Sequence, residues 1–190
     1  MNDYVDLHIC RRPDLTGRQI LEALFRRIHL ALALSKKTDV GLSFPEVNEK
    51  TRFLGYVLRL HGLEPSLRDT LHAADLSSLR DCLKIGEISK APSKALFRTV
   101  SRRQVKFALE SLRRRKAARH NLTISEAAES WPDSARKKSN LPYIMVHSLS
   151  TNQKFPIFIK HGELAAQPTP GHFNFYGLSS KTTIPWFGGG

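Results

Sequence analysis

The chain opens with short segments in which hydrophobic residues alternate with polar ones or recur at helical spacing. From Tyr4 to Cys10 apolar and polar residues alternate, a pattern typical of a half-buried β-strand. Thr16 and Gln19 then fit a helix capping box. The apolar positions from Ile20 to Leu32 recur with a helical period, so a helix is expected directly after the first strand.

The pattern continues with two strands, a second helix and another extended segment. Residues 39–44 and 53–61 alternate again and predict strands. A helix is expected at 65–74, where a proline stands near its start, and an extended segment at 84–88. The order strand, helix, strand, strand, helix, strand is the split βαβ arrangement of a ferredoxin-like domain. We therefore predict an α+β protein whose N-terminal domain, residues 1–94, has this fold.

Residues 95–190 predict a second domain, with a helix and a small antiparallel sheet. No Gly, Pro or β-branched residue occurs from Phe107 to His120, which favours a helix. A short helix is expected at 121–133. The extended segments predicted for this domain are 95–100, 142–148, 155–161 and 172–176. The second and third of these flank a short polar loop and predict a β-hairpin.

Positive charge is concentrated in one stretch of this second domain. Residues 101–121 hold eight Lys and Arg against the single acid Glu110. The whole chain has a net charge of +13, but residues 1–94 hold 15 basic residues against 12 acids, whereas residues 95–190 hold 15 against five. Such an excess indicates a polyanionic partner, and nucleic acid fits it best. A solvated charged helix with no partner remains the alternative.

Other classes of function find little support in the sequence. The two cysteines, Cys10 and Cys82, stand apart, as in reduced thiols of a cytoplasmic protein. The eight histidines form no helical metal-ligand pair, and no phosphate-binding glycine loop occurs. We therefore expect no metal and no cofactor. The longest apolar stretch, Leu30 to Leu34, is far too short to cross a membrane.

His29 is the best candidate for catalysis by a side chain. It stands one helical turn after Phe25, at the edge of the apolar stripe, so its ring can pack on one side and remain reachable on the other. A half-buried structural histidine is the alternative. The basic half contributes Ser148 and Ser150 in the polar hairpin and Tyr176 in the expected C-terminal strand. A turn serine and a core aromatic residue are the alternatives there.

A series of segments, taken in order, carries a family resemblance. They are LFRRIHLAL around His29, VGLSFP from Val40, VSRRQVK from Val100, LRRRKAARH from Leu112, HSLSTNQKF from His147, FIKHG from Phe158, YGLS from Tyr176 and a Pro-Trp-Phe ending. Together they resemble the CRISPR-associated endoribonucleases that process precursor CRISPR RNA in subtype I-F systems. The resemblance covers almost the whole chain, and the order and spacing of the segments make it specific.

The resemblance implies where the RNA binds and which residues act. An arginine-rich helix of the C-terminal domain would lie in the major groove of the repeat hairpin. The implied catalytic residues are His29, Ser148 and Tyr176. The implied RNA-binding residues are Arg102, Gln104, Arg114, Arg115, Arg119, His120, Ser150 and Phe155. Among them, Arg102 and Gln104 would read base edges, Arg115 and Arg119 would bind phosphates, and Phe155 would stack on the terminal base pair. For Phe155, a hairpin core residue is the alternative.

The implied reaction is metal-independent cleavage at the 3′ foot of the hairpin. The ribose 2′-hydroxyl would attack the scissile phosphate and leave a 2′,3′-cyclic phosphate. His29 would transfer a proton, as base or as acid, because imidazole titrates near neutrality. Ser148 would hold the 2′-hydroxyl, and Tyr176 would pack on or hydrogen-bond His29.

The resemblance also implies partners. The enzyme would be a monomer when free, would stay on the mature guide RNA and would join the CRISPR-associated backbone proteins of the surveillance complex. Two other classes remain open: a non-catalytic module that binds RNA hairpins, and a basic DNA-binding or ribosome-associated protein.

Overall fold

The structure is a computed structural model that describes residues 2–103, 109–130, 139–147 and 153–188. The chain divides into two compact units, one formed by Met1–Arg103 with Leu141–Gly190 and the other by Gln104–Asn140. The division into domains at residue 94 stays a prediction. Among the described residues no helix combines the length and the apolar character that a membrane span requires.

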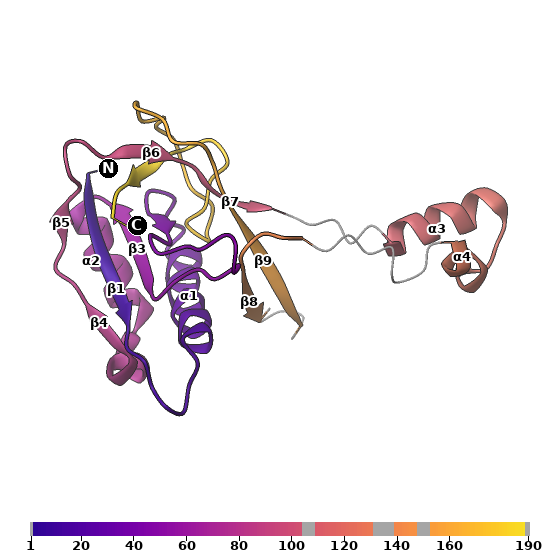
Figure 1. Cartoon of the computed structure of the whole chain (residues 1–190), viewed down its shortest axis with the longest axis horizontal. Helices are drawn as coiled ribbons and strands as arrows, with labels where there is room; N and C mark the ends of the chain where they lie inside the picture. Colours follow the sequence, from indigo (N-terminus) through magenta and orange to yellow (C-terminus); the bar gives the residue numbers. More distant parts are fainter. Residues whose placement is uncertain (1, 104–108, 131–138, 148–152, 189–190) are drawn as a thin grey trace. The chain divides into compact units, whose positions relative to one another are not determined.

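An antiparallel sheet with two helices forms the N-terminal part of the first unit (Figure 1). Its elements are β1 (Asp3–Ile9), α1 (Gly17–Leu34), β2 (Gly41–Ser43), β3 (Val57–Gly62), α2 (Glu64–Ala74), a 3-10 helix (Leu76–Cys82), β4 (Leu83–Ile85) and β5 (Ser89–Lys90). The strand order is β2-β3-β1-β4, and β5 pairs with the start of β1. The predicted order of strands and helices is thereby confirmed.

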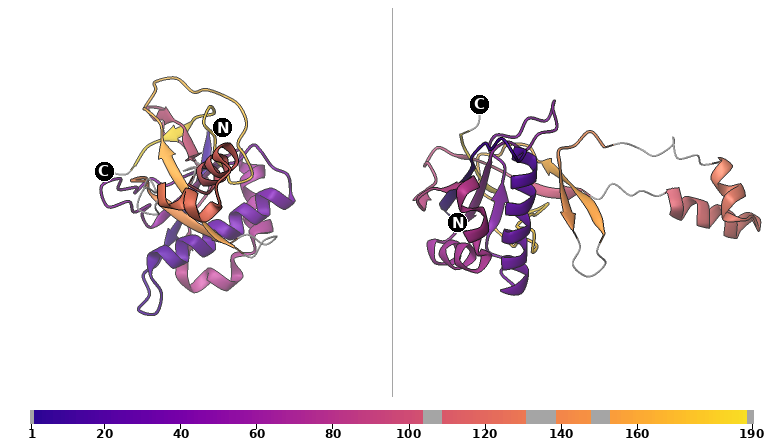
Figure 2. Two further views of the ribbon diagram at one scale, coloured as in Figure 1. Left: turned by 90° about the vertical axis from the view of Figure 1, so that its right-hand side faces the viewer. Right: turned by 90° about the horizontal axis from the view of Figure 1, so that it is seen from below.

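Helix α1 forms because its N-terminus is capped and one side of it is apolar. Thr16 accepts a hydrogen bond from the Gln19 amide, and the Gln19 side chain accepts from the Thr16 amide, which completes the predicted capping box. Helix α1 lies against α2 and β1, and its ribbon runs alongside the N-terminal sheet in Figure 2. The fully buried core residues in this region include Leu7, Leu24, Phe25, Ile28, Leu32, Leu58, Leu60 and Leu67.

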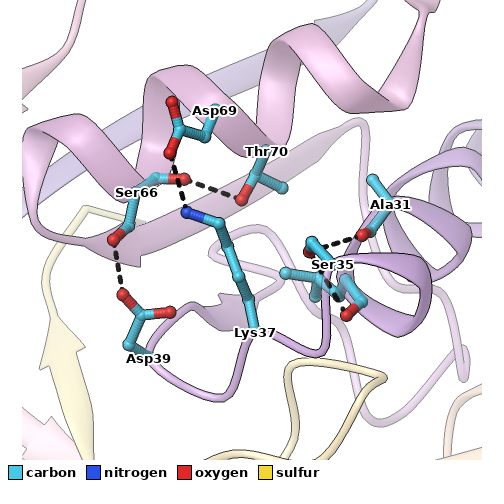
Figure 3. A network of polar contacts seen from close by, with 8 residues as sticks. Ala31, Ser35, Lys37, Asp39, Ser66, Asp69 and Thr70 are labelled. Carbon is cyan, nitrogen blue, oxygen red and sulfur yellow. Dashed lines mark hydrogen bonds and ion pairs between the residues drawn. The ribbon is translucent and has the colours of Figure 1, made fainter.

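Polar contacts join the end of α1 to α2 (Figure 3). The Ser35 hydroxyl donates to the Ala31 carbonyl at 2.7 Å and so closes the last turn of α1. Lys37 Nζ then lies 3.0 Å from a carboxylate oxygen of Asp69 on α2, and the Ser66 hydroxyl at the start of α2 donates to the Asp39 carboxylate. These contacts hold the α1–β2 connection against α2.

A second, three-stranded sheet is built from segments far apart in the sequence. Its strands are β7 (Val100–Arg103), β8 (Tyr143–His147) and β9 (Lys154–His161), in the order β7-β9-β8. The antiparallel pairing of β8 with β9 confirms the predicted hairpin. The extended segment predicted at 95–100 is divided between β6 (Leu96–Arg98) and β7, and β6 pairs with β10 (Ile184–Trp186).

The two sheets share one hydrophobic core. The same cluster of buried residues contains Leu42 and Phe44 near β2, Ile144 and Ile157 of the β8–β9 hairpin, and Ile184 of β10. The C-terminal strand thus lies within the body of the first unit, as its yellow ribbon beside β6 shows in Figure 1. Segments from both ends of the chain are therefore needed to complete the core.

The outer face of β3 carries a buried ion pair under the C-terminal segment. The Arg59 guanidinium donates to both carboxylate oxygens of Asp6, at 2.6 and 2.8 Å, and to the Phe187 carbonyl at 2.7 Å. The rings of Tyr4 and Phe187 lie 4.7 and 4.0 Å from its Cζ. The Arg59 guanidinium thus donates hydrogen bonds to three acceptor oxygens, two of Asp6 and one of Phe187. These charge-assisted bonds connect β1, β3 and the C-terminal segment.

The second unit contains two helices, α3 (Leu109–His120) and α4 (Ile124–Ser130). Asn121 has a φ of 51°, a left-handed conformation that often ends a helix. Thr123 and Glu126 then form a capping box, since the Glu126 carboxylate accepts from the Thr123 amide at 2.7 Å and the Thr123 hydroxyl accepts from the Glu126 amide at 3.2 Å. Helices are thereby confirmed within both predicted ranges, 107–120 and 121–133, over the residues that the structure describes.

Candidate active site

His29 lies on α1 with its ring half-buried between the helix and the C-terminal segment. Its Nδ1 is 2.7 Å from the carbonyl oxygen of Phe175. Because a carbonyl only accepts hydrogen bonds, Nδ1 carries the hydrogen and donates it. In the neutral ring, Nε2 then keeps its lone pair. The contact thus selects the tautomer that can accept a proton at Nε2.

The surroundings favour the neutral form of this imidazole. Burial lowers the pKa of His29 below its ordinary value. The hydrogen bond to the Phe175 carbonyl acts in the opposite direction, and the positive charge of Arg102 lowers the pKa further. A histidine that is neutral at pH 7 can act as a general base.

Tyr176 packs flat on the His29 ring. The two ring centroids are 4.0 Å apart and the planes differ by 12°. Phe25, one turn before His29 on α1, lies parallel to the same tyrosine at 6.2 Å. One aromatic ring therefore covers two successive turns of the helix and limits how far the imidazole can rotate.

A tight turn, and not the predicted strand, holds Tyr176 in this place. The expectation of an extended segment at 172–176 was wrong, because the Asn174 side chain accepts from the amides of Tyr176 and Leu178, at 2.9 and 3.2 Å, and folds the chain back. Gly177 has a φ of 67°, and a Cβ there would lie 2.5 Å from Leu42 Cγ. Only glycine fits this close, left-handed position.

The Arg102 guanidinium lies between two aromatic rings of the same unit. Its Cζ is 5.4 Å from the centroid of Tyr176 and 5.7 Å from that of Phe155. Arg102 is on β7 and Phe155 on β9, neighbouring strands of the second sheet. Arg102 and Phe155 of this sheet and Tyr176 of the C-terminal turn thus lie together, and Tyr176 stacks on His29.

Arginines dominate the described side chains of α3 in the second unit. Of the predicted RNA-binding residues there, Arg114, Arg115, Arg119 and His120 are all exposed. Arg115 and Arg119 stand four residues apart, so they share one face of the helix. Ala117 is buried instead, and α3 packs on α4. The packed side of α3 therefore leaves a basic face open to solvent.

The predicted site residues thus fall into three groups. The structure brings together His29, Tyr176, Arg102 and Phe155. Arg114, Arg115, Arg119 and His120 belong to the second unit. Gln104, Ser148 and Ser150 lie outside the described residues. The roles of all these residues stay predictions.

Two participants were not predicted from the sequence. The Phe175 carbonyl fixes the His29 tautomer, yet a backbone group leaves no sequence signal. Phe25 was placed in the helical apolar stripe, but its contact with Tyr176 joins positions about 150 residues apart. Within the described part of the chain, no cluster of three or more His, Cys, Asp or Glu side chains is arranged to hold a metal ion.

A protein-family model and two known proteins match this chain over nearly its full length. The family model described as "CRISPR-associated protein (Cas_Csy4)" matches residues 4–187. A protein of Pseudomonas aeruginosa (strain UCBPP-PA14), named CRISPR-associated endonuclease Cas6/Csy4, is 37% identical over 187 residues, which cover 98% of this chain and 100% of the relative. A protein of the same name from Escherichia coli (strain UTI89 / UPEC) is 34% identical over the same shares of both chains.

Proposed function

Because the chain belongs to the Cas_Csy4 family of CRISPR-associated proteins, we propose that it is the endoribonuclease that cuts precursor CRISPR RNA at the 3′ foot of the repeat hairpin. The observation that carries the proposal is the His29 imidazole, held by the Phe175 carbonyl and the Tyr176 ring. Its family relatives are named endonucleases. The neutral, oriented ring supplies the proton transfer that RNA cleavage by its own 2′-hydroxyl requires.

In the proposed reaction His29 is the general base. Nε2 accepts the proton of the 2′-hydroxyl, the 2′-oxygen forms a bond to the adjacent phosphorus, and the bond from phosphorus to the 5′-oxygen breaks. The leaving 5′-oxygen takes a proton from water and the imidazolium returns its proton to the solvent, which gives a 5′-hydroxyl, a 2′,3′-cyclic phosphate and a neutral His29. Ser148 would hold the 2′-hydroxyl in line. Tyr176 acts as a positioning residue, because its contact is with the His29 ring.

The hairpin would be held by several kinds of contact. Arg114, Arg115, Arg119 and His120 would bind phosphates through the basic face of α3, while Arg102 and Gln104 would read base edges of the stem. Phe155 would stack on the terminal base pair, and Ser150 would contact the RNA near the cut. In the structure Arg102 rests against the Phe155 and Tyr176 rings. Recognition of the stem would therefore take place beside the catalytic ring.

We also propose a ferredoxin-like fold for residues 1–94 and an RNA-binding role for residues 95–190. The sheet order β2-β3-β1-β4 with antiparallel neighbours supports the first assignment. The basic face of α3 supports the second. None of the proposed stem contacts depends on an intact scissile bond, so the processed guide RNA should stay bound. The enzyme, monomeric when free, would then join other CRISPR-associated subunits on that guide.

Incubation with a repeat hairpin in EDTA tests the proposal. We expect one cut at the 3′ foot, a product that carries a 2′,3′-cyclic phosphate, and close to one product per enzyme. A hairpin with a 2′-deoxy nucleotide before the cut should bind and remain whole. Binding without any cut of the ribose substrate would favour a non-catalytic hairpin-binding module, and cleavage of the deoxy substrate would exclude 2′-hydroxyl attack.

A further inference from the structure

A pocket of about 260 Å³ lies between α1 and the free edge of β8. Its lining residues are Glu22, Ala23, Arg26, Met145, Val146, His147 and Lys154. Its volume is just below the roughly 300 to 1,000 Å³ of typical small-ligand pockets. It is therefore too small to hold more than about one nucleotide.

Strand β8 runs along α1, so that this pocket lies near the turn of α1 that carries His29. Arg18 of α1 donates to the Tyr143 hydroxyl at 2.9 Å, and Glu22 accepts from the Met145 amide at 3.2 Å. Four residues of helix and two of strand both advance about 6 to 7 Å, so the next step brings Arg26 to the end of the strand. Arg26 is three residues before His29, on the adjacent turn of the same helix.

Two cations of the pocket are available for an anion. The side chains of Arg26 and Lys154 are exposed. Neither forms a hydrogen bond or ion pair with another residue in the described ranges. The one acid of the lining, Glu22, is engaged by the backbone amide of Met145. Ala23, Met145 and Val146 supply apolar wall. This combination of two cations and apolar side chains suits a phosphate attached to a less polar organic group.

The pairing of β8 with β9 places Lys154, which lines this pocket, next to Phe155 on β9. His147 is directly opposite Lys154, and Val146 is directly opposite Phe155. Side chains alternate between the two faces of a hairpin, so Lys154 and Phe155 point to opposite faces. An RNA strand that leaves a stem stacked on Phe155 and passes His29 would therefore meet Lys154, the neighbour of Phe155 on β9, and Arg26, three residues before His29 on α1.

We propose that this pocket, the 3′ pocket, binds the nucleotide that follows the scissile phosphate and that Arg26 and Lys154 hold that nucleotide's own 3′ phosphate. The assignment rests on the proposed function. Under that function the nucleotide before the cut belongs to the paired stem, so the strand that leaves past His29 is the 3′ one. The 3′ pocket positions the leaving side of the reaction and does not contact the attacking hydroxyl.

Binding of two uncleavable hairpins tests the 3′ pocket. Both carry a 2′-deoxy nucleotide before the cut and one nucleotide after it, which ends in a 3′ phosphate in one RNA and in a 3′-hydroxyl in the other. We expect the phosphate form to bind about fivefold tighter at 0.1 M salt, as two exposed ion pairs would give. Arg26→Ala with Lys154→Ala should bring this ratio close to one.

Arg27→Ala is the matched control, because Arg27 stands next to Arg26 but donates to Ser78 at 3.0 Å, away from the 3′ pocket. The control should keep the wild-type ratio. Since the readout is a ratio between two RNAs, a general change in hairpin affinity cancels. A ratio of one in the wild type, or an unchanged ratio in the double variant, would overturn the 3′ pocket alone. Failure to bind either hairpin would contradict the proposed function and this inference together.

Discussion

The rings of His29 and Tyr176 lie parallel with centroids 4.0 Å apart, although the residues are 147 positions apart in the chain. The same C-terminal turn supplies the Phe175 carbonyl that binds His29 Nδ1. One turn thus sets both the tautomer and the orientation of the imidazole. The proposed base is therefore assembled by the contact of a helix with a distant loop.

Replacement of the imidazole should separate cleavage from binding. We expect His29→Ala to slow hairpin cleavage by about 10²- to 10⁴-fold, the usual contribution of a general base. Hairpin affinity should change by less than about 1 kcal/mol, because the ring moves a proton and carries little of the binding. Single-turnover rates and equilibrium binding measure the two effects. Parallel loss of both would argue against a catalytic role.

The pH dependence of cleavage should reflect the lowered pKa of His29. A general base must be deprotonated, so the rate should rise with pH, inflect below the ordinary histidine value of about 6.5, and be level at neutral pH. Arg102 is one of the groups that lower this pKa. Arg102→Ala should move the inflection to higher pH, whereas Arg103→Ala, which changes the next residue of β7, serves as the control. If the inflection did not move, the charge of Arg102 would not be a cause of the lowered pKa of His29.

The ring of Tyr176, more than its hydroxyl, should matter for orientation. Tyr176→Phe keeps the stacked surface, so its cleavage rate should stay within about threefold of wild type. Tyr176→Ala removes a stacking contact of about 0.5 to 1.5 kcal/mol and frees the imidazole, and loss of a fixed geometry can cost about 10²-fold in rate. Melting temperatures of both variants show whether the turn survives. Equal rates for the two variants would contradict a positioning role.

Substitution of the α3 arginines and substitution of Arg102 should change RNA binding in different ways. Arg115→Ala and Arg119→Ala should weaken binding to any stem and reduce the slope of log K against log salt by about 0.7 to 0.9 for each lost phosphate contact. Arg102→Ala should instead relax discrimination at one base pair, at about 1 to 3 kcal/mol on the cognate hairpin. Titrations of mutated stems at several salt concentrations distinguish the two. A common profile would mean that Arg102 does not read sequence.

Two buried histidines away from the site should make the fold sensitive to acid. Burial lowers the pKa of His161 to about 4 and that of His61 to about 3. Neither His161 nitrogen has a hydrogen-bond partner among the described residues, and the nearest carboxylate oxygen, Glu49 Oε1, lies 3.8 Å from Nδ1. The unfolded chain binds these two protons near pH 6.5, whereas the folded chain does not. The free energy of unfolding is therefore independent of these histidines above about pH 6.5. It then falls toward pH 4, by about 3 kcal/mol for each histidine.

Urea unfolding between pH 7 and pH 4 measures this loss. His161→Leu should remove about half of the pH dependence, because it deletes one of the two buried titrating groups. His8→Gln, which changes an exposed histidine of β1, should leave the dependence as it is. A wild-type protein whose stability is flat over this range would show that the two rings are protonated or solvated in the folded state.

The sequence by itself determined the local elements and where the positive charge is concentrated. Helix α1 follows from a capping box and an apolar period that lie within the helix and its cap, and the basic face of α3 follows from charge density alone. Such signals involve residues close together in the sequence, so they can be recognised without knowledge of the fold. The same holds for the β8–β9 hairpin, whose strands are close in sequence. The order of strands and helices along the N-terminal part of the chain also followed from local patterns.

Only the tertiary structure decided how the candidate site is assembled. The sequence placed Tyr176 in a strand, but Asn174 and Gly177 form a turn whose shape depends on contact with Leu42 of β2. The Phe175 carbonyl contributes through the backbone, which every residue shares. The position of Arg102 against two rings depends on β7 pairing with β9 across 55 or more residues. Long-range packing sets these contacts, and no local pattern of residues encodes it.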